Sequence, residues 1–181
     1  MQTTPTLLNP VQRPGDLAHL LAPVAEEMRA VDATVRQRLS SDVVLIGTIG
    51  EYIIGAGGKR LRPAILLLIA RALGYRGSAH VLLATVIEFI HTATLLHDDV
   101  VDESDLRRGR PTSNAEFGNP ASVLVGDFLY SRAFQMMVGV DNMRVMQVLA
   151  EIGLTAQDVS RAVTEVMAGL GTKPGSFDVS V

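Results

Sequence analysis

Apolar and polar residues along most of this chain follow the 3.6-residue period of an α-helix. Residues 1–15 carry three prolines and form an irregular arm, and a first helix is expected from Asp16, its N-cap, to about Leu39. The same period predicts further helices over residues 43–54, 63–73, 80–103, 120–137 and 143–152. A loop is expected over 104–120, and no segment shows the alternation of a β-strand. The predicted fold class is therefore all-α, a helical bundle.

Composition narrows the function classes. The 181 residues suffice for one domain with a real core, and 48% hydrophobic against 4% aromatic content suits packed aliphatic helices. The chain has no cysteine, which excludes disulfides, thiolate zinc sites and a cysteine nucleophile. Its net charge of −3 argues against non-specific binding of nucleic acid, so no nucleic-acid partner is expected.

Neither targeting nor membrane insertion is predicted from the sequence. Residues 1–11 lack the basic start and apolar core of a secretory signal. The longest uninterrupted apolar runs, such as 64–70, are too short to cross a bilayer. We therefore expect a cytoplasmic protein without a membrane span.

The most informative segment is 95–102, where three carboxylates end an apolar helical run. Asp98 and Asp102 are one helical turn apart, so both side chains project from one face. Asp99 lies about 100° round the helix from Asp98 and can join them only from the edge. Two carboxylates on one face repel unless a cation lies between them, and oxygen ligands favour Mg²⁺ or Ca²⁺.

Basic residues follow these acids directly. Three arginines, which suit an anion carrying several oxygens, come next: Arg107, Arg108 and Arg110. A solvated charged face is the alternative interpretation. The apolar run before the acids favours a metal–diphosphate site, because buried carboxylates are costly without a partner.

A second anion pocket is predicted at 57–63, where two glycines precede Lys59, Arg62 and a helix-starting proline. This segment lacks the pattern of a Walker loop. His91 lies two turns before Asp98 and is either a core histidine bonded to backbone or part of the site. Asp127 is either a buried hydrogen-bonding group or part of the polar site. Two anion pockets and a divalent metal suggest two phosphorylated substrates.

Two other metal chemistries share part of this residue pattern. The spacing of Glu88 and His91 occurs in di-iron bundles, but the second copy that such bundles need is absent, which excludes this interpretation. His97 and Asp98 could belong to an HD-type metal phosphohydrolase, with His80 or His91 upstream. That alternative leaves Lys59, Arg62 and the arginine cluster without a role.

Several motifs together resemble one known family, the trans-isoprenyl (polyprenyl) diphosphate synthases. The matching segments occur in the family's order: 57–63, His91, 95–102, 107–112 and 124–129. The resemblance is greatest to the long-chain bacterial group, of octaprenyl type, which makes the ubiquinone side chain. It implies an isoprenoid-synthase helical bundle around a deep apolar cavity, and a homodimer. It also implies Mg²⁺-dependent condensation of isopentenyl diphosphate with an allylic diphosphate, such as farnesyl diphosphate, into an all-trans polyprenyl diphosphate.

The resemblance also implies roles for individual residues. Four residues would bind isopentenyl diphosphate: Lys59, Arg62, His91 and Arg108. Asp98 and Asp102, with Asp99 assisting, would hold Mg²⁺ that bridges the allylic diphosphate, and Arg107 would contact that diphosphate.

Product length in this family depends on residues just before the aspartates. Here these are the small Ala93 and Thr94, which would leave the cavity open to a long chain. Phe134 or Met137 would form the floor of that cavity.

The resemblance covers about the first half of a family member. We therefore expect residues 16–150 to form the N-terminal half of an isoprenoid synthase domain and 151–181 a divergent tail. The second aspartate-rich motif and the Lys-Thr and Gln positions of the family are absent from this sequence. Half a cavity should expose apolar helix faces. A non-catalytic, diphosphate-binding fragment or synthase subunit is therefore the main alternative.

Overall fold

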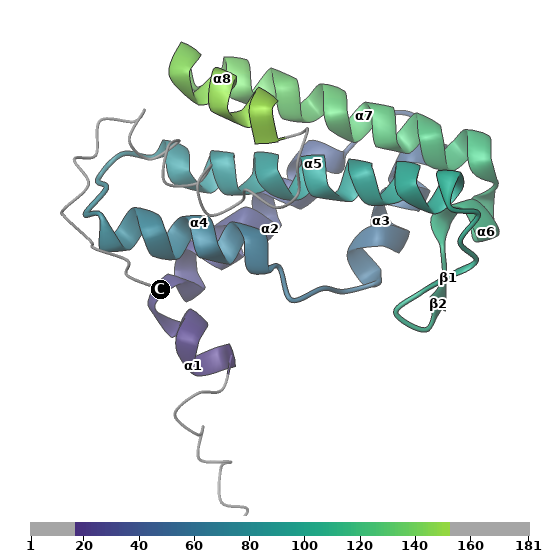
Figure 1. Cartoon of the computed structure of the whole chain (residues 1–181), viewed down its shortest axis with the longest axis horizontal. Coiled ribbons are helices and arrows are strands. Elements are labelled where there is room, and N and C mark those ends of the chain that lie inside the picture. Colours follow the sequence, from purple (N-terminus) through teal and green to yellow (C-terminus); the bar gives the residue numbers. More distant parts are fainter. Residues whose placement is uncertain (1–16, 153–181) are drawn as a thin grey trace, which may run out of the picture.

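The computed structural model describes residues 17–152 and has the predicted all-α architecture (Figure 1). The elements run in the order α1 (Leu17–Leu21), a 3-10 turn η1 (Ala22–Val24), α2 (Ala25–Leu39), α3 (Val44–Gly55), α4 (Leu61–Ala72), α5 (Ala79–Val101), β1 (Leu106–Arg107), β2 (Arg110–Pro111), α6 (Ser113–Phe117), α7 (Asn119–Val138) and α8 (Met143–Ile152).

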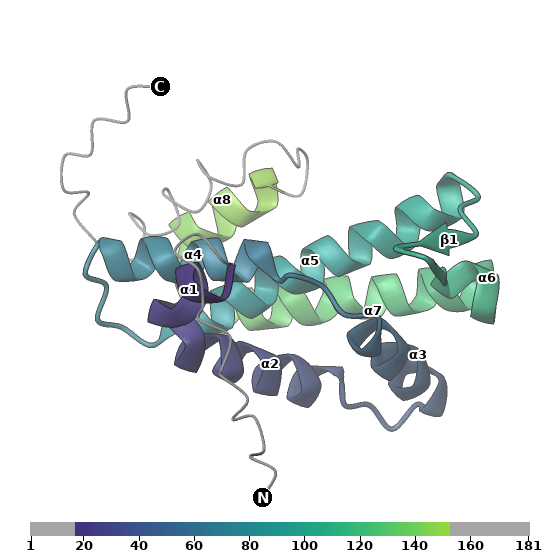
Figure 2. The ribbon, with the colours of Figure 1, turned by 90° about the horizontal axis from the view of Figure 1, so that it is seen from below.

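Helix α5 is the centre of the bundle. It packs along α7, and α4 and α2 lie against its other faces. Helices α2 and α3 run along one side of the α5–α7 pair, as the second view shows (Figure 2). The largest fully buried side chains come from most of the helices, α2 to α8: Val31, Ile49, Leu66, Leu67, Leu83, Phe89, Leu129, Met137 and Leu149. This aliphatic core is the one that the composition predicts.

Helix α5 is more apolar than its short uninterrupted apolar runs indicate. At 23 residues, with a mean hydropathy of 1.6 in its best 18-residue window, α5 is long and apolar enough to cross a membrane by length and composition. Half of that window is buried inside the protein. The apolar residues of α5 therefore form the centre of the helical core, and a central core helix passes this test without any membrane.

The first predicted helix is interrupted at Pro23. A 3-10 turn over Ala22–Val24 separates α1 from α2, because proline has no N–H to donate and its ring clashes with the preceding turn. Asp16, the predicted N-cap, lies outside the described residues. The remaining helices begin and end within about two residues of the predicted positions.

The loop predicted over 104–120 is wrong in detail, because it contains a hairpin and a helix. Strands β1 and β2 pair antiparallel, with Arg107 opposite Arg110. Arg108 and Gly109 between them have φ values of 54° and 76°, as the two-residue turn of a tight hairpin requires. Thr112 then caps α6 by accepting a hydrogen bond from Ala115 N at 3.4 Å. Two-residue strands are too short to show alternation, so the sequence pattern could not reveal them.

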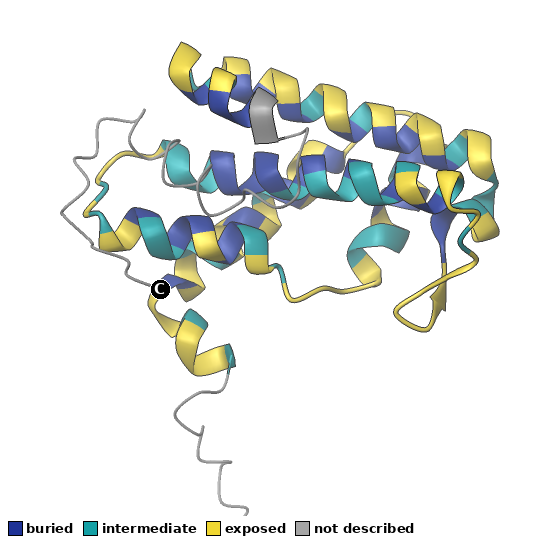
Figure 3. Cartoon of the chain, viewed as in Figure 1, coloured by how far each residue is buried: buried dark blue, intermediate teal, exposed yellow. Residues whose placement is uncertain are grey.

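One side of α7 is exposed (Figure 3). Several of the exposed residues are apolar, in line with the expectation of uncovered apolar helix faces. They recur at helical spacing: Val123, Tyr130, Phe134 and Val138. Exposed fractions reach 39% for Phe134 and 61% for Val138. This face is called the α7 apolar stripe below.

Candidate functional site

A cavity of about 580 Å³ lies between α2, α3, α4, α5 and the β1–β2 hairpin. Six cationic side chains line it: Lys59, Arg60, Arg62, Arg107, Arg108 and Arg110. Apolar side chains form much of the remaining wall: Val35, Leu39, Ile53, Ile54, Phe89, Leu95, Leu96 and Leu129. The cavity therefore joins a strongly cationic region to an apolar one.

Arg62 and His91 meet inside this cavity. Arg62 Nη1 lies 2.8 Å from His91 Nε2, and because arginine can only donate, Nε2 is the acceptor. Burial, followed by the charges of Arg62, Arg108 and Arg107, lowers the pKa of His91 to about 4. His91 is therefore a neutral imidazole at physiological pH, with its proton on Nδ1. Of the two interpretations that the sequence left open, the structure favours a place in the site.

Arg60 faces two acids on neighbouring helices. Its Nη1 lies 3.1 Å from Glu88 Oε1 on α5, and its Nε lies 2.9 Å from Asp32 Oδ1 on α2. Burial raises the pKa of Glu88, although Arg60, Arg62 and Arg108 act in the opposite direction. Arg60 adopts a left-handed backbone (φ 43°) directly before α4. Its ion pairs therefore hold the turn that presents Lys59 and Arg62 to the cavity.

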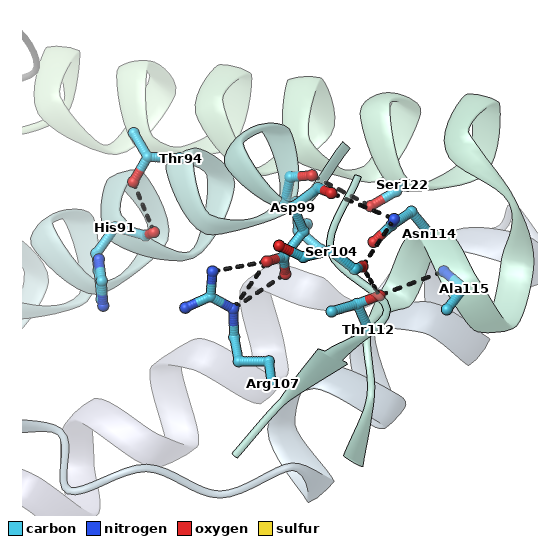
Figure 4. Close-up of polar contacts among 10 residues, drawn as sticks. His91, Thr94, Asp99, Ser104, Arg107, Thr112, Asn114, Ala115 and Ser122 are labelled. Atoms are coloured by element: carbon cyan, nitrogen blue, oxygen red, sulfur yellow. Dashed lines mark hydrogen bonds and ion pairs between the residues drawn. The ribbon is translucent and has the colours of Figure 1, made fainter. Parts of the chain in front are cut away.

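The arginines after α5 have three different partners. Arg107 donates from Nε to both carboxylate oxygens of Asp99 at 3.0 Å, and from Nη2 to Oδ1 at 2.6 Å (Figure 4). Arg108 donates from Nη1 to the Gly57 carbonyl at 2.7 Å. Arg110 donates from Nη1 to the Gly55 carbonyl, also at 2.7 Å. The three arginines that are close together in the sequence therefore form hydrogen bonds with three different residues.

Asp99 is the buried member of the three aspartates, with 5% of its side chain exposed. Its bonds to Arg107 raise the pKa of that arginine. Its backbone carbonyl accepts from Ser104 N at 2.9 Å, which closes the turn after α5. Asn114 Nδ2 also bonds to the Ser104 carbonyl, at 3.1 Å, and ties α6 to this turn (Figure 4). Asp99 therefore belongs to the wall of the cavity and orients Arg107.

Asp98 and Asp102 are exposed at the end of α5. Asp102 N donates to the Asp98 carbonyl at 2.8 Å, so the helical geometry extends through both residues and places them one turn apart, as predicted. Within residues 17–152, no side chain forms a hydrogen bond or ion pair with either carboxylate, and no three His, Asp or Glu side chains gather as a ready-made metal site. The structure thus has an unpartnered carboxylate pair beside Arg107.

The residues expected to set product length lie outside the wall of this cavity. Ala93 is fully buried, and Thr94 is half-buried, with its hydroxyl donating to the His91 carbonyl at 2.8 Å. Met137 is buried in the core, whereas Phe134 is exposed on α7 against Tyr130. Their predicted roles stay predictions.

Asp127 is exposed rather than buried. Its Oδ1 lies 3.3 Å from His97 Nε2, across the contact between α7 and α5. The neighbouring Gly126 permits this approach, because a Cβ there would lie 2.8 Å from His97 Cδ2 and closer still to Nε2. His97 therefore faces Asp127, which gives the HD-type phosphohydrolase no support.

Sequence reasoning missed three residues of the cavity wall. Arg60 and Glu88 pair across 28 positions. Tyr52 donates from its hydroxyl to the Pro111 carbonyl at 2.8 Å, across 59 positions. Such pairings carry no local pattern; the one available signal was an acid, Glu88, within an otherwise apolar helix.

Comparison with known proteins gives one consistent result. The family model for polyprenyl synthetase matches residues 43–158. Over 127 residues the chain is 61% identical to octaprenyl diphosphate synthase of Escherichia coli (strain K12), an alignment that covers 70% of this chain and 39% of that protein. The chain thus spans about two fifths of the length of the curated relatives it matches.

Solved structures agree with this result. A decaprenyl diphosphate synthase from Rhodobacter capsulatus superposes with a TM-score of 0.72 at 53% identity, covering 76% of this chain and 43% of that one. A polyprenyl synthase from Caulobacter crescentus CB15, complexed with calcium and isoprenyl diphosphate, gives 0.77 at 34% identity, covering 92% and 59%.

Proposed function

Since the chain belongs to the polyprenyl synthetase family, we propose that it is part of a prenyltransferase that condenses isopentenyl diphosphate with an allylic diphosphate such as farnesyl diphosphate. The product would be a long-chain all-trans polyprenyl diphosphate of octaprenyl type, the precursor of a quinone side chain. The observation that carries this proposal is one cavity in which cations from α4 and from the hairpin converge. The exposed Asp98 and Asp102 lie on the same helix as the lining residue Asp99 and are themselves outside the cavity wall.

The carboxylate pair fits a divalent metal by its donor chemistry. Mg²⁺ is commonly held by one or two carboxylates, with substrate phosphates and water completing its shell. Asp98 and Asp102 would supply such a set, so a third protein ligand would not be needed. When bound there, Mg²⁺ would stabilise the negative charge of a departing diphosphate. Calcium in the Caulobacter crescentus complex is an oxygen-preferring cation of the same class.

Four cations of the cavity would divide between the two substrates. Lys59, Arg62 and Arg108 would bind the diphosphate of isopentenyl diphosphate, while neutral His91 orients Arg62 through Nε2. Arg107, held by Asp99 through Nε and Nη2, keeps Nη1 for the allylic diphosphate. These fixed charges would favour ionisation of the allylic C–O bond. The alkene of isopentenyl diphosphate then attacks the allylic carbon, and loss of one proton forms the new double bond.

A non-catalytic role is the second candidate, and two observations favour it. The chain spans about two fifths of its curated relatives, and the α7 apolar stripe is uncovered. In this case the chain would bind diphosphates, or a synthase partner, without turning substrate over. Residence in the cytoplasm and assembly as a homodimer belong to the same proposal as the prenyltransferase.

Incorporation of radiolabelled isopentenyl diphosphate onto farnesyl diphosphate with Mg²⁺ tests the prenyltransferase directly. Extracted products should form a ladder that ends in a long chain. Asp98→Asn should abolish incorporation, whereas Asp105→Asn, at an exposed acid in the following turn, should not. A folded chain that binds Mg²⁺-pyrophosphate without incorporation would support the non-catalytic role, and one that binds neither substrate would contradict both.

A further inference from the structure

The anion-binding part of the cavity is built from two segments that are far apart in the sequence. Lys59 and Arg62 come from the α3–α4 connection and the start of α4, whereas Arg108 comes from the turn of the β1–β2 hairpin. The hairpin lies at the edge of the helical bundle, beside α3 and α6 (Figure 1). Its position against the α3–α4 connection therefore decides whether the three cations can meet one ligand.

Two reciprocal contacts join the hairpin to α3, and we call them the Tyr52–Arg110 link. The Tyr52 hydroxyl donates to the Pro111 carbonyl at 2.8 Å, and Arg110 Nη1 donates to the Gly55 carbonyl at 2.7 Å. The Arg110 guanidinium also lies over the Tyr52 ring, 5.2 Å from its centroid. Each segment thus gives one donor and one acceptor to the other.

The Tyr52 ring is itself held in place by α6. Phe117 meets it edge-on, with centroids 5.2 Å apart and an interplanar angle of 85°. A tyrosine fixed on two sides defines where the Pro111 carbonyl lies. It thereby defines the path of β2, which begins two residues after Arg108.

Arg108 occupies the position that this link produces. Its Nη1 bonds to the Gly57 carbonyl, two residues beyond the carbonyl that Arg110 uses. A Cβ at Gly58 would lie 2.9 Å from Arg108 Nη1, so this approach depends on the absence of a side chain there. The hairpin and the end of α3 are therefore in contact at two nearby points, and the contact of Arg108 is the one closer in sequence to Lys59.

We propose that Tyr52 and Arg110 are positioning residues, which hold the hairpin against the α3–α4 connection so that Arg108 and Lys59 face one diphosphate. We assign Arg110 to this positioning role rather than to the diphosphate, because its guanidinium both donates to the Gly55 carbonyl and lies over the Tyr52 ring. This inference rests on the proposed diphosphate-binding function of the cavity.

The first test is the affinity for inorganic pyrophosphate without metal, measured by calorimetry. Tyr52→Phe removes one hydroxyl, and Arg110→Gln removes the charge and the stacked plane. Each should weaken binding about 3- to 10-fold, the factor that one hydrogen bond is worth. The double variant should bind pyrophosphate with an affinity within about twofold of the weaker single variant, because both substitutions break the same link.

Matched controls exist on α7. Tyr130→Phe removes a tyrosine hydroxyl outside the cavity, and Arg132→Gln removes an arginine stacked 5.1 Å from the Phe128 ring. Both should bind pyrophosphate as the unaltered chain does. Wild-type affinity in Tyr52→Phe and Arg110→Gln would overturn the inference. So would a loss confined to Arg110→Gln together with a smaller salt dependence, because that result would make Arg110 a direct ligand.

The second test needs no bound anion. Trypsin should cleave after Lys59 and Arg108 at least about threefold faster in Tyr52→Phe and Arg110→Gln than in the controls, because exposed loops are cleaved once they move. The Arg110–Pro111 bond resists trypsin, so Arg110→Gln removes no site. Unchanged cleavage would overturn the link as a positioning device. Failure of the unaltered chain to bind pyrophosphate would instead overturn the proposed function, and cleavage would still decide the link.

Discussion

At the scale of single residues, Asp99 shows how a cluster of like residues divides into different roles. Three aspartates within five positions look equivalent in the sequence, yet Asp98 and Asp102 are exposed, while Asp99 is buried and bonded to Arg107. A buried carboxylate is tolerated only with such a partner. The direction of the side chain from the helix, rather than its charge, therefore assigns the role.

Asp99→Asn should destabilise the protein by about 1–2 kcal/mol, at or below the low end of the range for hydrogen bonds to charged groups, because solvent screens the two-fifths exposed Arg107. Urea unfolding measures this loss, and Asp98→Asn is the matched control, with an expected change below about 0.5 kcal/mol. Equal unfolding midpoints for Asp99→Asn and the unaltered chain would show that the pair contributes nothing to stability.

His91 gives a prediction with a defined pH range. The pKa of its imidazole is lowered from 6.5 to about 4 in the folded chain, so the unfolded chain binds more protons between these values. The contribution of His91 to stability is therefore complete above pH 6.5 and is lost as the pH falls toward 4. The difference in unfolding free energy between the unaltered chain and His91→Gln should shrink over this range.

Nuclear magnetic resonance of the histidine Cε1 protons checks the same point in the folded state. The signal that disappears in His91→Gln should titrate near pH 4. A midpoint above pH 6 would mean that the ring carries a proton beside Arg62, and would contradict the neutral acceptor assigned here.

Among the elements, the pairing of α5 with α7 sets the position of the aspartates, and it depends on a glycine. Gly126→Ala would place a methyl group against the His97 ring, 2.8 Å from Cδ2, and should destabilise the protein by about 1–3 kcal/mol through overpacking. Gly47→Ala on α3 is the control, since nothing lies within 4 Å of its Cβ position. That change should stabilise by about 0.5–1 kcal/mol. If the midpoint temperatures of thermal unfolding of Gly126→Ala and Gly47→Ala shifted in the same direction, the overpacking argument would be wrong.

The elements also show what sequence could and could not predict. Helices α3, α4, α5, α7 and α8 were predictable because each has an apolar stripe of helical period. The break at Pro23 was a local signal within an apparently continuous stripe. The hairpin was not predictable, since its left-handed turn uses Arg108 where an Asn or Gly would mark it.

The same division applies to the candidate site. Lys59, Arg62, His91 and Arg108 line one cavity, and their roles as substrate ligands stay predictions. Tyr52, Arg60 and Glu88 escaped prediction, because their partners lie 28 to 59 positions away. Residues that recur at helical spacing can be recognised in a sequence. A contact between two segments that are far apart in the sequence depends on the fold.

On the scale of the whole molecule, the α7 apolar stripe is an exposed apolar face of the described fold. Val123, Tyr130, Phe134 and Val138 face outward from one helix at helical spacing. Adjacent exposed apolar side chains of this size favour association with another protein surface. If the proposed homodimer forms through α7, sedimentation velocity should show a dimer whose fraction rises with concentration.

Phe134→Asp and Val138→Asp together should then shift the population toward monomer by at least about tenfold in dissociation constant, since burying two charges at an interface costs more than 1.4 kcal/mol. Val44→Asp is the control, because Val44 is 82% exposed at the start of α3, away from the stripe. A dimer that survives both changes at α7 would place the interface elsewhere. A monomer at every concentration would leave the stripe to a different partner, such as the remainder of a synthase.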